Sequence, residues 1–237
     1  MTAPPAAARH PHLAEPLPDG WVRVDCHSHS LWSGDCTTTP EELAEAVVET
    51  GLDVLCLTDH NAVAGAVRLA DELPCRVIVG EEVRVGQGEI IGLFLQERIP
   101  GGLRPVEAAI RIREQGGVVY IPHPFDPMRN CLRPEQIDEL VAEGLVDAIE
   151  GLNSKTSLSS LNRKAVEYGR AHDLAVGAGS DAHVPAALAA GCVVMPDFTG
   201  PGDFCASLRA GTIVGHHYDP PRPWTPRIVP SVVDPAG

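Results

Sequence analysis

The sequence predicts an α/β fold, a single domain built around a largely parallel sheet. Three observations carry this prediction. Short apolar runs, typical of parallel strands covered on both faces, alternate with segments of helical periodicity along most of the 237 residues. No linker-like stretch interrupts this alternation between residues 21 and 217. Polar side chains gather where the predicted strands end, which is the edge at which parallel α/β folds build their sites.

The first predicted strand, residues 21–29, carries two imidazoles and a carboxylate on one face. Side chains alternate along a strand with a period of two, so Asp25, His27 and His29 share a face. Burying polar groups costs free energy unless they are paired or ligated. The pattern favours a divalent metal bound by the two histidines, with Asp25 supporting them from outside the ligand set. Taken alone, the strand is equally compatible with a polar rim at a sheet edge.

The remaining elements follow from apolar runs, helix caps and glycines. Further strands are expected at residues 54–57, 76–79, 90–95, 118–121, 146–149, 174–178, 193–195 and 212–214. Helices are expected at residues 40–50, 62–73, 105–115, 134–143, 159–172 and 202–210. The first helix has the clearest signals, since Thr39 is suited to the N-cap, Glu42 completes a capping box and Gly51 ends it.

Two features bear on how the strands are arranged. The turn between the third and fourth strands contains Gly86 and Gly88, which predicts an antiparallel interruption of the sheet. About seven strand–helix repeats favour a closed barrel over an open sheet, although spacing alone does not decide between them. We expect three regions: a flexible lead-in (residues 1–20) with solvent-exposed His10 and His12, a barrel (21–217) and a Pro-rich tail (218–237).

Composition excludes several classes of protein. A formal net charge of −14 argues against a surface for nucleic acid or an anionic membrane, although bound dications would still permit a phosphate substrate. No segment is long and apolar enough for a membrane span, and the N-terminus has no signal-peptide pattern. The seven cysteines form no Cys-x-x-Cys pair and are typical of free thiols in a reducing compartment. We therefore expect a soluble, cytoplasmic protein.

The ends of the predicted strands predict a metal site. Eight polar residues fall there: His27, His29, His60, Glu82, His123, Asn153, Asp181 and His183. Unrelated core histidines would not follow strand ends, so a shared metal site is favoured over imidazoles that are each satisfied by backbone groups. Nitrogen and oxygen donors without thiolate suit Zn, Mn or Fe, and their number predicts two or three ions. Asp59 precedes His60 and is expected to support the ligands.

Five motifs resemble those of the PHP (polymerase and histidinol phosphatase) superfamily of metal-dependent phosphoesterases. They are Asp25-Cys26-His27-Ser28-His29, Thr58-Asp59-His60-Asn61, Gly80-Glu81-Glu82-Val83, Pro122-His123-Pro124 and Gly179-Ser180-Asp181-Ala182-His183. Each motif is weak alone, but the set is specific and spans nearly the whole predicted domain in the family's order. The resemblance implies a distorted seven-stranded (β/α) barrel that holds a trinuclear metal site.

The resemblance also implies how the ligands divide among three ions. One ion would be held by His27, His29, Glu82 and Asp181, a second by Glu82 and His123, and a third by Asp35, His60 and His183. The sequence departs from the family at the second ion, where members often have another histidine before the His-Pro motif. The only candidate there is Glu89.

Such a centre predicts hydrolysis of a phosphate ester. A bound metal lowers the pKa of its water from 15.7 to roughly 7, so a hydroxide bridging two ions is expected to attack phosphorus. Residues expected to act in catalysis through the metals are His27, His29, Glu82, His123, Asp181 and His183. Arg129, Asn153 and Lys155 are expected to contact the phosphate. The expected partner is a small-molecule phosphate mono- or diester, because the chain has no inserted or basic domain to hold a polymer.

Two alternatives stay open. An amidohydrolase-type enzyme would cleave C–N or C–O bonds, but that type usually ends in a lone Asp and often uses a bridging Lys, whereas here His183 follows Asp181 by two positions. A non-catalytic metal-binding module is the other alternative, and the completeness of the ligand set argues against it.

Overall fold

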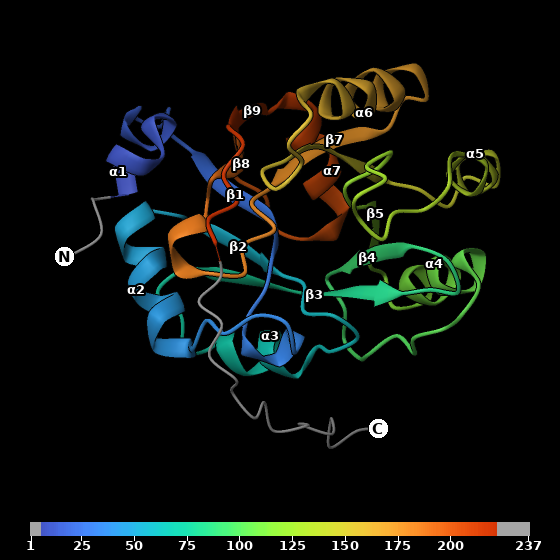
Figure 1. Ribbon diagram of the computed structural model, residues 1–237, viewed down its shortest axis with the longest axis horizontal. Coiled ribbons are helices and arrows are strands. Elements are labelled where there is room, and N and C mark those ends of the chain that lie inside the picture. The colour runs from blue at the N-terminus through green and yellow to red at the C-terminus, as the bar shows by residue number, and fades with distance from the viewer. Residues whose placement is uncertain (1–5, 222–237) are drawn as a thin grey trace.

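The computed structural model describes residues 6–221 and shows one nine-stranded sheet curled into a barrel, with helices around its outside (Figure 1). The strands are β1 (Trp21–Ser28), β2 (Val54–Leu57), β3 (Arg76–Arg84), β4 (Glu89–Leu93), β5 (Val118–Ile121), β6 (Ala148–Asn153), β7 (Ala175–Gly179), β8 (Gly191–Pro196) and β9 (Thr212–Gly215). Their order in the sheet is β7-β6-β5-β4-β3-β2-β1-β8-β9. The predicted α/β fold is confirmed.

The helices pack against the outer face of the sheet. They are α1 (Ala6–Arg9), α2 (Pro40–Thr50), α3 (Ala64–Leu69), α4 (Pro105–Glu114), α5 (Pro134–Ala142), α6 (Ser159–Ala171) and α7 (Pro201–Ala210). Helix α2 has the predicted ends: Thr39 and Glu42 form a reciprocal capping box, and Gly51 takes the left-handed conformation that ends the helix. No helix in the described part of the chain is long and apolar enough to cross a bilayer.

The barrel nearly closes because the chain after β7 returns to the end of β1. The Asp181 amide donates to the His27 carbonyl (2.7 Å), and the His29 amide donates to the Ala182 carbonyl (3.1 Å). The start of β1 instead pairs with β8, which runs antiparallel to it. Seven strands therefore form the distorted barrel that the resemblance implied, and β8 and β9 are added beside its first strand.

Strand β4 interrupts the parallel arrangement, as the glycines between it and β3 predicted. It runs antiparallel to both of its neighbours, β3 and β5. Pairing with β4 also keeps β3 extended as far as Arg84, beyond the predicted end at residue 79. Helix α3 is shorter than the predicted helix at residues 62–73, because Asn61 has a left-handed φ of 51° and its amide donates to the Glu82 carbonyl.

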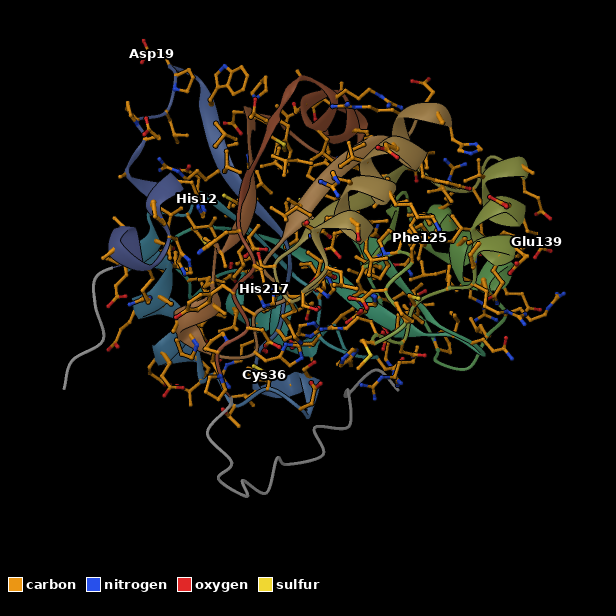
Figure 2. The ribbon with its side chains drawn as sticks, turned by 45° about the horizontal axis from the view of Figure 1, so that its top comes forward. His12, Asp19, Cys36, Phe125, Glu139 and His217 are labelled. Atoms are coloured by element: carbon orange, nitrogen blue, oxygen red, sulfur yellow. The ribbon has the colours of Figure 1, made fainter. Side chains whose placement is uncertain are left out.

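The segment before β1 is bound to the barrel within the described residues. It contains α1 and a short 3-10 helix, η1 (Pro11–Ala14), and His12 marks its position in Figure 2. The expectation of a solvent-exposed His10 is wrong: the residue is buried, and its Nε2 lies 2.9 Å from the Ala186 carbonyl. Its ring also contacts His216, with centroids 5.2 Å apart. The domain boundaries at residues 20 and 217 stay a prediction, and most of the predicted tail lies outside the described residues.

The buried position of His10 predicts that acid weakens the fold. Burial lowers the pKa of His10 from 6.5 to about 4, and the nearby His12 and His216 act in the same direction. The unfolded chain therefore binds this proton between pH 4 and 6.5 while the folded chain does not. The contribution of neutral His10 to the unfolding free energy is therefore fully present above about pH 7. It is lost as the pH falls toward 4, and this loss amounts to at most about 3 kcal/mol.

Chemical denaturation at a series of pH values checks this prediction. His10→Gln keeps a donor for the Ala186 carbonyl but cannot titrate, so it should flatten the dependence of the unfolding free energy on pH. His172→Gln, which changes an exposed histidine, should leave that dependence as in the wild type. If the unfolding free energy depended on pH in the same way in the wild type and both variants, His10 would not be the group responsible for the loss of stability in acid.

Candidate metal centre

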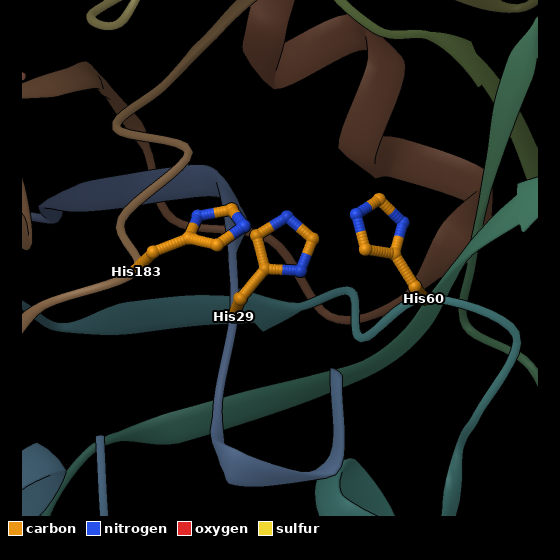
Figure 3. A group of neighbouring side chains, drawn as sticks. All are labelled: His29, His60 and His183. Atoms are coloured by element: carbon orange, nitrogen blue, oxygen red, sulfur yellow. The ribbon is translucent and has the colours of Figure 1, made fainter. Parts of the chain in front are cut away.

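The mouth of the barrel, at the ends of its strands, brings together every side chain predicted as a metal ligand. The segments that follow β1, β2 and β7 place His29, His60 and His183 side by side (Figure 3). Strands β3 and β4 supply Glu82 and Glu89, and His123 follows β5. Residues more than 150 positions apart thus converge on one buried site, because parallel strands end at the same edge.

Glu82 lies at the middle of this site. The residue is fully buried, and its Oε1 lies 2.8 Å from His123 Nε2. Its Oε2 lies 3.3 Å from Nε2 of both His27 and His29, and 3.1 Å from His60 Nδ1. Burial alone would raise the pKa of Glu82, but the adjacent imidazoles lower it well below its usual range. One carboxylate therefore faces four histidines, as expected of a ligand shared between ions.

Asp181 is the second buried carboxylate. Its Oδ1 lies 3.4 Å from His29 Nε2 and 3.9 Å from His27 Nε2. Burial opposes ionisation of Asp181, yet Lys155 and Arg129 lower its pKa well below the usual range. Asp181 also has a left-handed φ of 51°, and such conformations of non-glycine residues gather at functional sites.

Asp35 forms the outer side of the site. Its Oδ2 lies 3.2 Å from His183 Nε2 and 3.6 Å from His60 Nε2, and its side chain is 39% exposed. The three residues that the resemblance implied for one ion are therefore adjacent, and the site opens to solvent beside them.

Glu89 reaches the site from the start of β4. Its Oε1 lies 3.6 Å from His60 Nδ1, and its Oε2 lies 3.6 Å from His123 Nε2. Burial and the neighbouring Glu82 raise the pKa of Glu89. The carboxylate thus lies beside His123, which the resemblance implied as a ligand of the second ion.

The residues present fit divalent metal ions. His60 Nδ1 and Glu82 Oε2 are buried and lie 3.1 Å apart without hydrogen-bond geometry, and His123 Nδ1 is buried without a hydrogen-bond partner, which is costly unless a cation satisfies such atoms. The site contains four groups of three residues in which each residue offers one donor atom and the three atoms lie within 4.8 Å of one another. The groups are His29, His60 and His183; His27, His29 and Glu82; His27, His123 and Asp181; and His60, Glu82 and Glu89. Their imidazole and carboxylate donors suit first-row transition metals.

All three residues predicted to bind phosphate lie beside Asp181. Lys155 Nζ is 3.2 Å from Asp181 Oδ1, and Arg129 donates to Asp181 Oδ2. The amide nitrogen of Asn153 donates to Glu150 Oε2 (3.0 Å) as well as to Asp181 Oδ2 (3.1 Å). Both of its amide hydrogens are engaged, so Asn153 positions these carboxylates.

The two predicted supporting acids, Asp25 and Asp59, accept hydrogen bonds from backbone amides. Asp25 is fully buried and accepts from the amides of His27 (3.2 Å), Ser180 (2.9 Å) and Ala189 (3.0 Å). Burial raises its pKa to about 6 despite these bonds. Asp59 accepts from the amide and the hydroxyl of Ser30, each at 2.7 Å. Both carboxylates thus fix the loops that carry the ligands.

Sequence reasoning missed Glu150 and Ser33. Glu150 is fully buried, its Oε1 lies 3.2 Å from His27 Nδ1, and its Oε2 accepts from the His123 amide at 2.6 Å. A carboxylate on the second nitrogen of a ligand histidine fixes the ring's tautomer and orientation. Ser33 Oγ lies 2.8 Å from His29 Nδ1 and accepts from the His60 amide at 3.1 Å. The sequence feature that could have indicated Glu150 is its position directly after the short apolar run at residues 146–149.

Comparison with known proteins identifies the family of this chain. The PHP domain model matches residues 25–170, and a model described as PHP-associated matches residues 159–213. The uncharacterized protein MJ0417 of Methanocaldococcus jannaschii is 37% identical over 164 residues, which cover 68% of this chain and 65% of that protein. An error-prone DNA polymerase of Mycobacterium tuberculosis is 44% identical over 67 residues, 27% of this chain and 6% of the polymerase.

Solved structures share the fold. A two-domain protein from Bacteroides vulgatus that contains a predicted PHP-like metal-dependent phosphoesterase has a TM-score of 0.67 at 20% identity, covering 85% of this chain and 67% of that one. The lesion-specific endonuclease PfuEndoQ from Pyrococcus furiosus has a TM-score of 0.61 at 17% identity, covering 81% and 57%. With more than half of its length matched by the family model, the chain belongs to the PHP domain family.

Proposed function

We propose that the protein is a metal-dependent phosphoesterase that hydrolyses a small-molecule phosphate mono- or diester. The observation that carries the proposal is the contact of two cations, Arg129 and Lys155, with a carboxylate of the candidate metal centre. In this proposal, the metal ligands and the cations that bind the phosphate lie side by side at the end of the barrel where the strands terminate. Membership of the PHP domain family supports the same activity.

Each group has a distinct role in this proposal. The divalent ions, when bound, supply a water activated for attack and positive charge for the phosphate oxygens. Arg129 and Lys155 bind non-bridging oxygens, and because both side chains are largely buried, their charges are poorly screened by water. Glu150 orients His27, and Asn153 holds Glu150 and Asp181 in place. The Ser and Cys side chains have no part as nucleophiles.

A small substrate is favoured over a nucleic acid by the formal net charge of −14, which repels a polyanion. The similarity to an endonuclease and to a segment of a DNA polymerase makes nucleic acid the competing substrate class. The test must therefore contain both.

The test measures turnover after metal-stripped protein is loaded with Mn²⁺, Fe²⁺ or Zn²⁺. Its substrates are small phosphate mono- and diesters, a single-stranded oligonucleotide, and an amide and lactone set. We expect release of phosphate or alcohol from a small ester, and loss of that turnover in His27→Ala and Asp181→Ala. Cleavage of the oligonucleotide alone, or of amides or lactones alone, would contradict the proposal.

A further inference from the structure

Two turns carry the cations that the proposed function assigns to the phosphate. The turn at residues 127–130 follows β5 and contains Arg129, and the turn at residues 154–155 follows β6 and contains Lys155. Arg129 donates to Asp181 Oδ2, and Lys155 Nζ lies 3.2 Å from Asp181 Oδ1. The two side chains therefore converge, from different parts of the chain, on the two oxygens of one carboxylate. Two oxygens of a single phosphate group can accept the same pair of contacts.

Asp126 fixes the turn that contains Arg129. The residue is 4% exposed and directly follows Phe125, which is labelled in Figure 2. Its Oδ1 accepts from the Met128 amide at 3.0 Å, and its backbone carbonyl accepts from the Arg129 amide at 3.0 Å. A carboxylate that accepts from the amide two positions later closes an Asx-turn, which restrains the local backbone. The direction in which the Arg129 side chain leaves the chain thus depends on Asp126.

Thr156 joins the second turn to the first. The residue is 3% exposed and directly follows Lys155, and its amide donates to the Asn153 carbonyl at 3.1 Å. Its hydroxyl donates to Asp126 Oδ2 at 2.9 Å in a buried contact between residues 30 positions apart. Because both partners are buried, water cannot readily replace a lost hydroxyl, and the carboxylate oxygen would be left without this donor.

We propose that Asp126 and Thr156 are positioning residues for the phosphate: their hydrogen bond holds the turn of Arg129 against the turn of Lys155, so that the two cations bind one phosphate group as a pair. This inference rests on the proposed function. A misplacement of about 1 Å in a catalytic site can cost roughly 10²-fold in rate, so the two turns need a fixed spacing. The role requires the hydrogen bond and not the negative charge of Asp126.

The kinetic test compares Thr156→Val, which keeps the shape of the side chain without its hydroxyl, with Thr156→Ser, which keeps the hydroxyl. It uses metal-loaded protein, a small phosphate ester as substrate and inorganic phosphate as competitive inhibitor. In Thr156→Val we expect the inhibition constant of phosphate to rise about tenfold and kcat/KM to fall about tenfold, the effect of losing one hydrogen bond to a charged group. Thr156→Ser should behave as the wild type. Thr212→Val, which changes an exposed threonine at the start of β9, is the matched control and should leave both constants unchanged.

A double-mutant cycle separates positioning from a general loss of structure. If Thr156 acts through Arg129, Thr156→Val should cost much less in an Arg129→Gln protein than in the wild type, because the group that it positions is already gone. Losses that simply add in the double variant would contradict the proposal.

Two changes at Asp126 test the same hydrogen bond from its other end. In Asp126→Asn the side-chain oxygen can still accept from the Met128 amide, and the new N–H can donate to the Thr156 hydroxyl. This variant should keep most of the wild-type kcat/KM, whereas Asp126→Ala should lose as much as Thr156→Val. Equal losses in Asp126→Asn and Asp126→Ala would show that the charge matters and the hydrogen bond does not. Thermal unfolding of each variant shows that it is folded.

A second readout needs no turnover. The chain has two lysines, Lys155 with a side chain that is 5% exposed and Lys164 on the exposed side of α6. Brief treatment with acetic anhydride, followed by mass spectrometry of the peptides, should acetylate Lys164 and largely spare Lys155 in the wild type. Thr156→Val should raise the ratio of Lys155 to Lys164 acetylation several-fold, and Thr156→Ser should leave it unchanged.

The outcomes distinguish this inference from the proposed function. A wild type that turns over no phosphate ester overturns the proposed function and this inference with it. A wild type that does turn over an ester, while Thr156→Val and Thr156→Ser respond alike to inorganic phosphate, overturns the positioning role and leaves the phosphoesterase proposal standing. Acetylation of Lys155 that stays unchanged in Thr156→Val likewise contradicts the positioning role alone.

Discussion

Glu82→Gln should abolish the centre as a catalyst. Its carboxylate faces four histidines: His27, His29, His60 and His123. Every ion bound between Glu82 and one of these imidazoles would therefore lose a negatively charged ligand. Metal-ion catalysis supplies several kcal/mol of transition-state stabilisation, and each 1.36 kcal/mol is tenfold in rate. We therefore expect turnover of a phosphate ester to fall by roughly 10³-fold or more, and fewer ions to be bound per chain.

The measurement combines kcat/KM with elemental analysis of the same preparation. Glu72→Gln is the matched control, since Glu72 lies on the surface in an ion pair with Arg68. Exposed pairs contribute little to stability, so this variant should behave as the wild type. A Glu82→Gln protein that kept the full metal content and a tenth of the wild-type rate would show that Glu82 is not the shared ligand.

Gly179→Ala should damage the site without replacing any candidate ligand. A methyl group at Gly179 would lie 2.4 Å from His27 Cβ and 2.9 Å from the His27 backbone nitrogen, distances that real Cβ atoms do not adopt. It would also meet Glu150 Oε1 at 2.7 Å. Since β1 must move to make room, we expect a loss of about 1–3 kcal/mol in unfolding free energy and about 10²-fold in kcat.

Gly202→Ala provides the comparison for this variant. Nothing lies within 4 Å of a Cβ built on Gly202, which is in the first turn of α7. Alanine there should be neutral or stabilise the protein by a few tenths of a kcal/mol, with unchanged turnover. Equal activities of Gly179→Ala and Gly202→Ala would mean that His27 tolerates displacement.

Sequence reasoning located the side chains that meet in the candidate centre, because the ends of parallel strands leave a recognisable sequence pattern. An apolar run followed within three residues by His60, His123 or Asp181 has few explanations other than a site at the edge of a parallel sheet. The capping box of α2 and the antiparallel β4 were predictable for a similar reason, since both follow from residues close together in the chain.

Features that depend on distant partners were not predictable. In the sequence, Glu150 follows the apolar run at residues 146–149 as an exposed carboxylate would, and only the fold reveals that His27, 123 positions earlier, lies against it. The burial of His10 depends on the Ala186 carbonyl, which arrives 176 positions later. The placement of β8 against the start of β1 likewise follows from how the chain returns after β7, and no local motif encodes it.

The pairing of β1 determines where the gene for such a protein can be divided. Its first half pairs with β8 and its last residues are bonded by the chain after β7, both of which lie beyond residue 170, where the PHP domain match ends. A gene fragment cut at that boundary would encode two unsatisfied strand edges and a candidate ligand set without Asp181 and His183. The two matched segments therefore form one folding unit, and a chain cut between them would expose strand edges that favour aggregation.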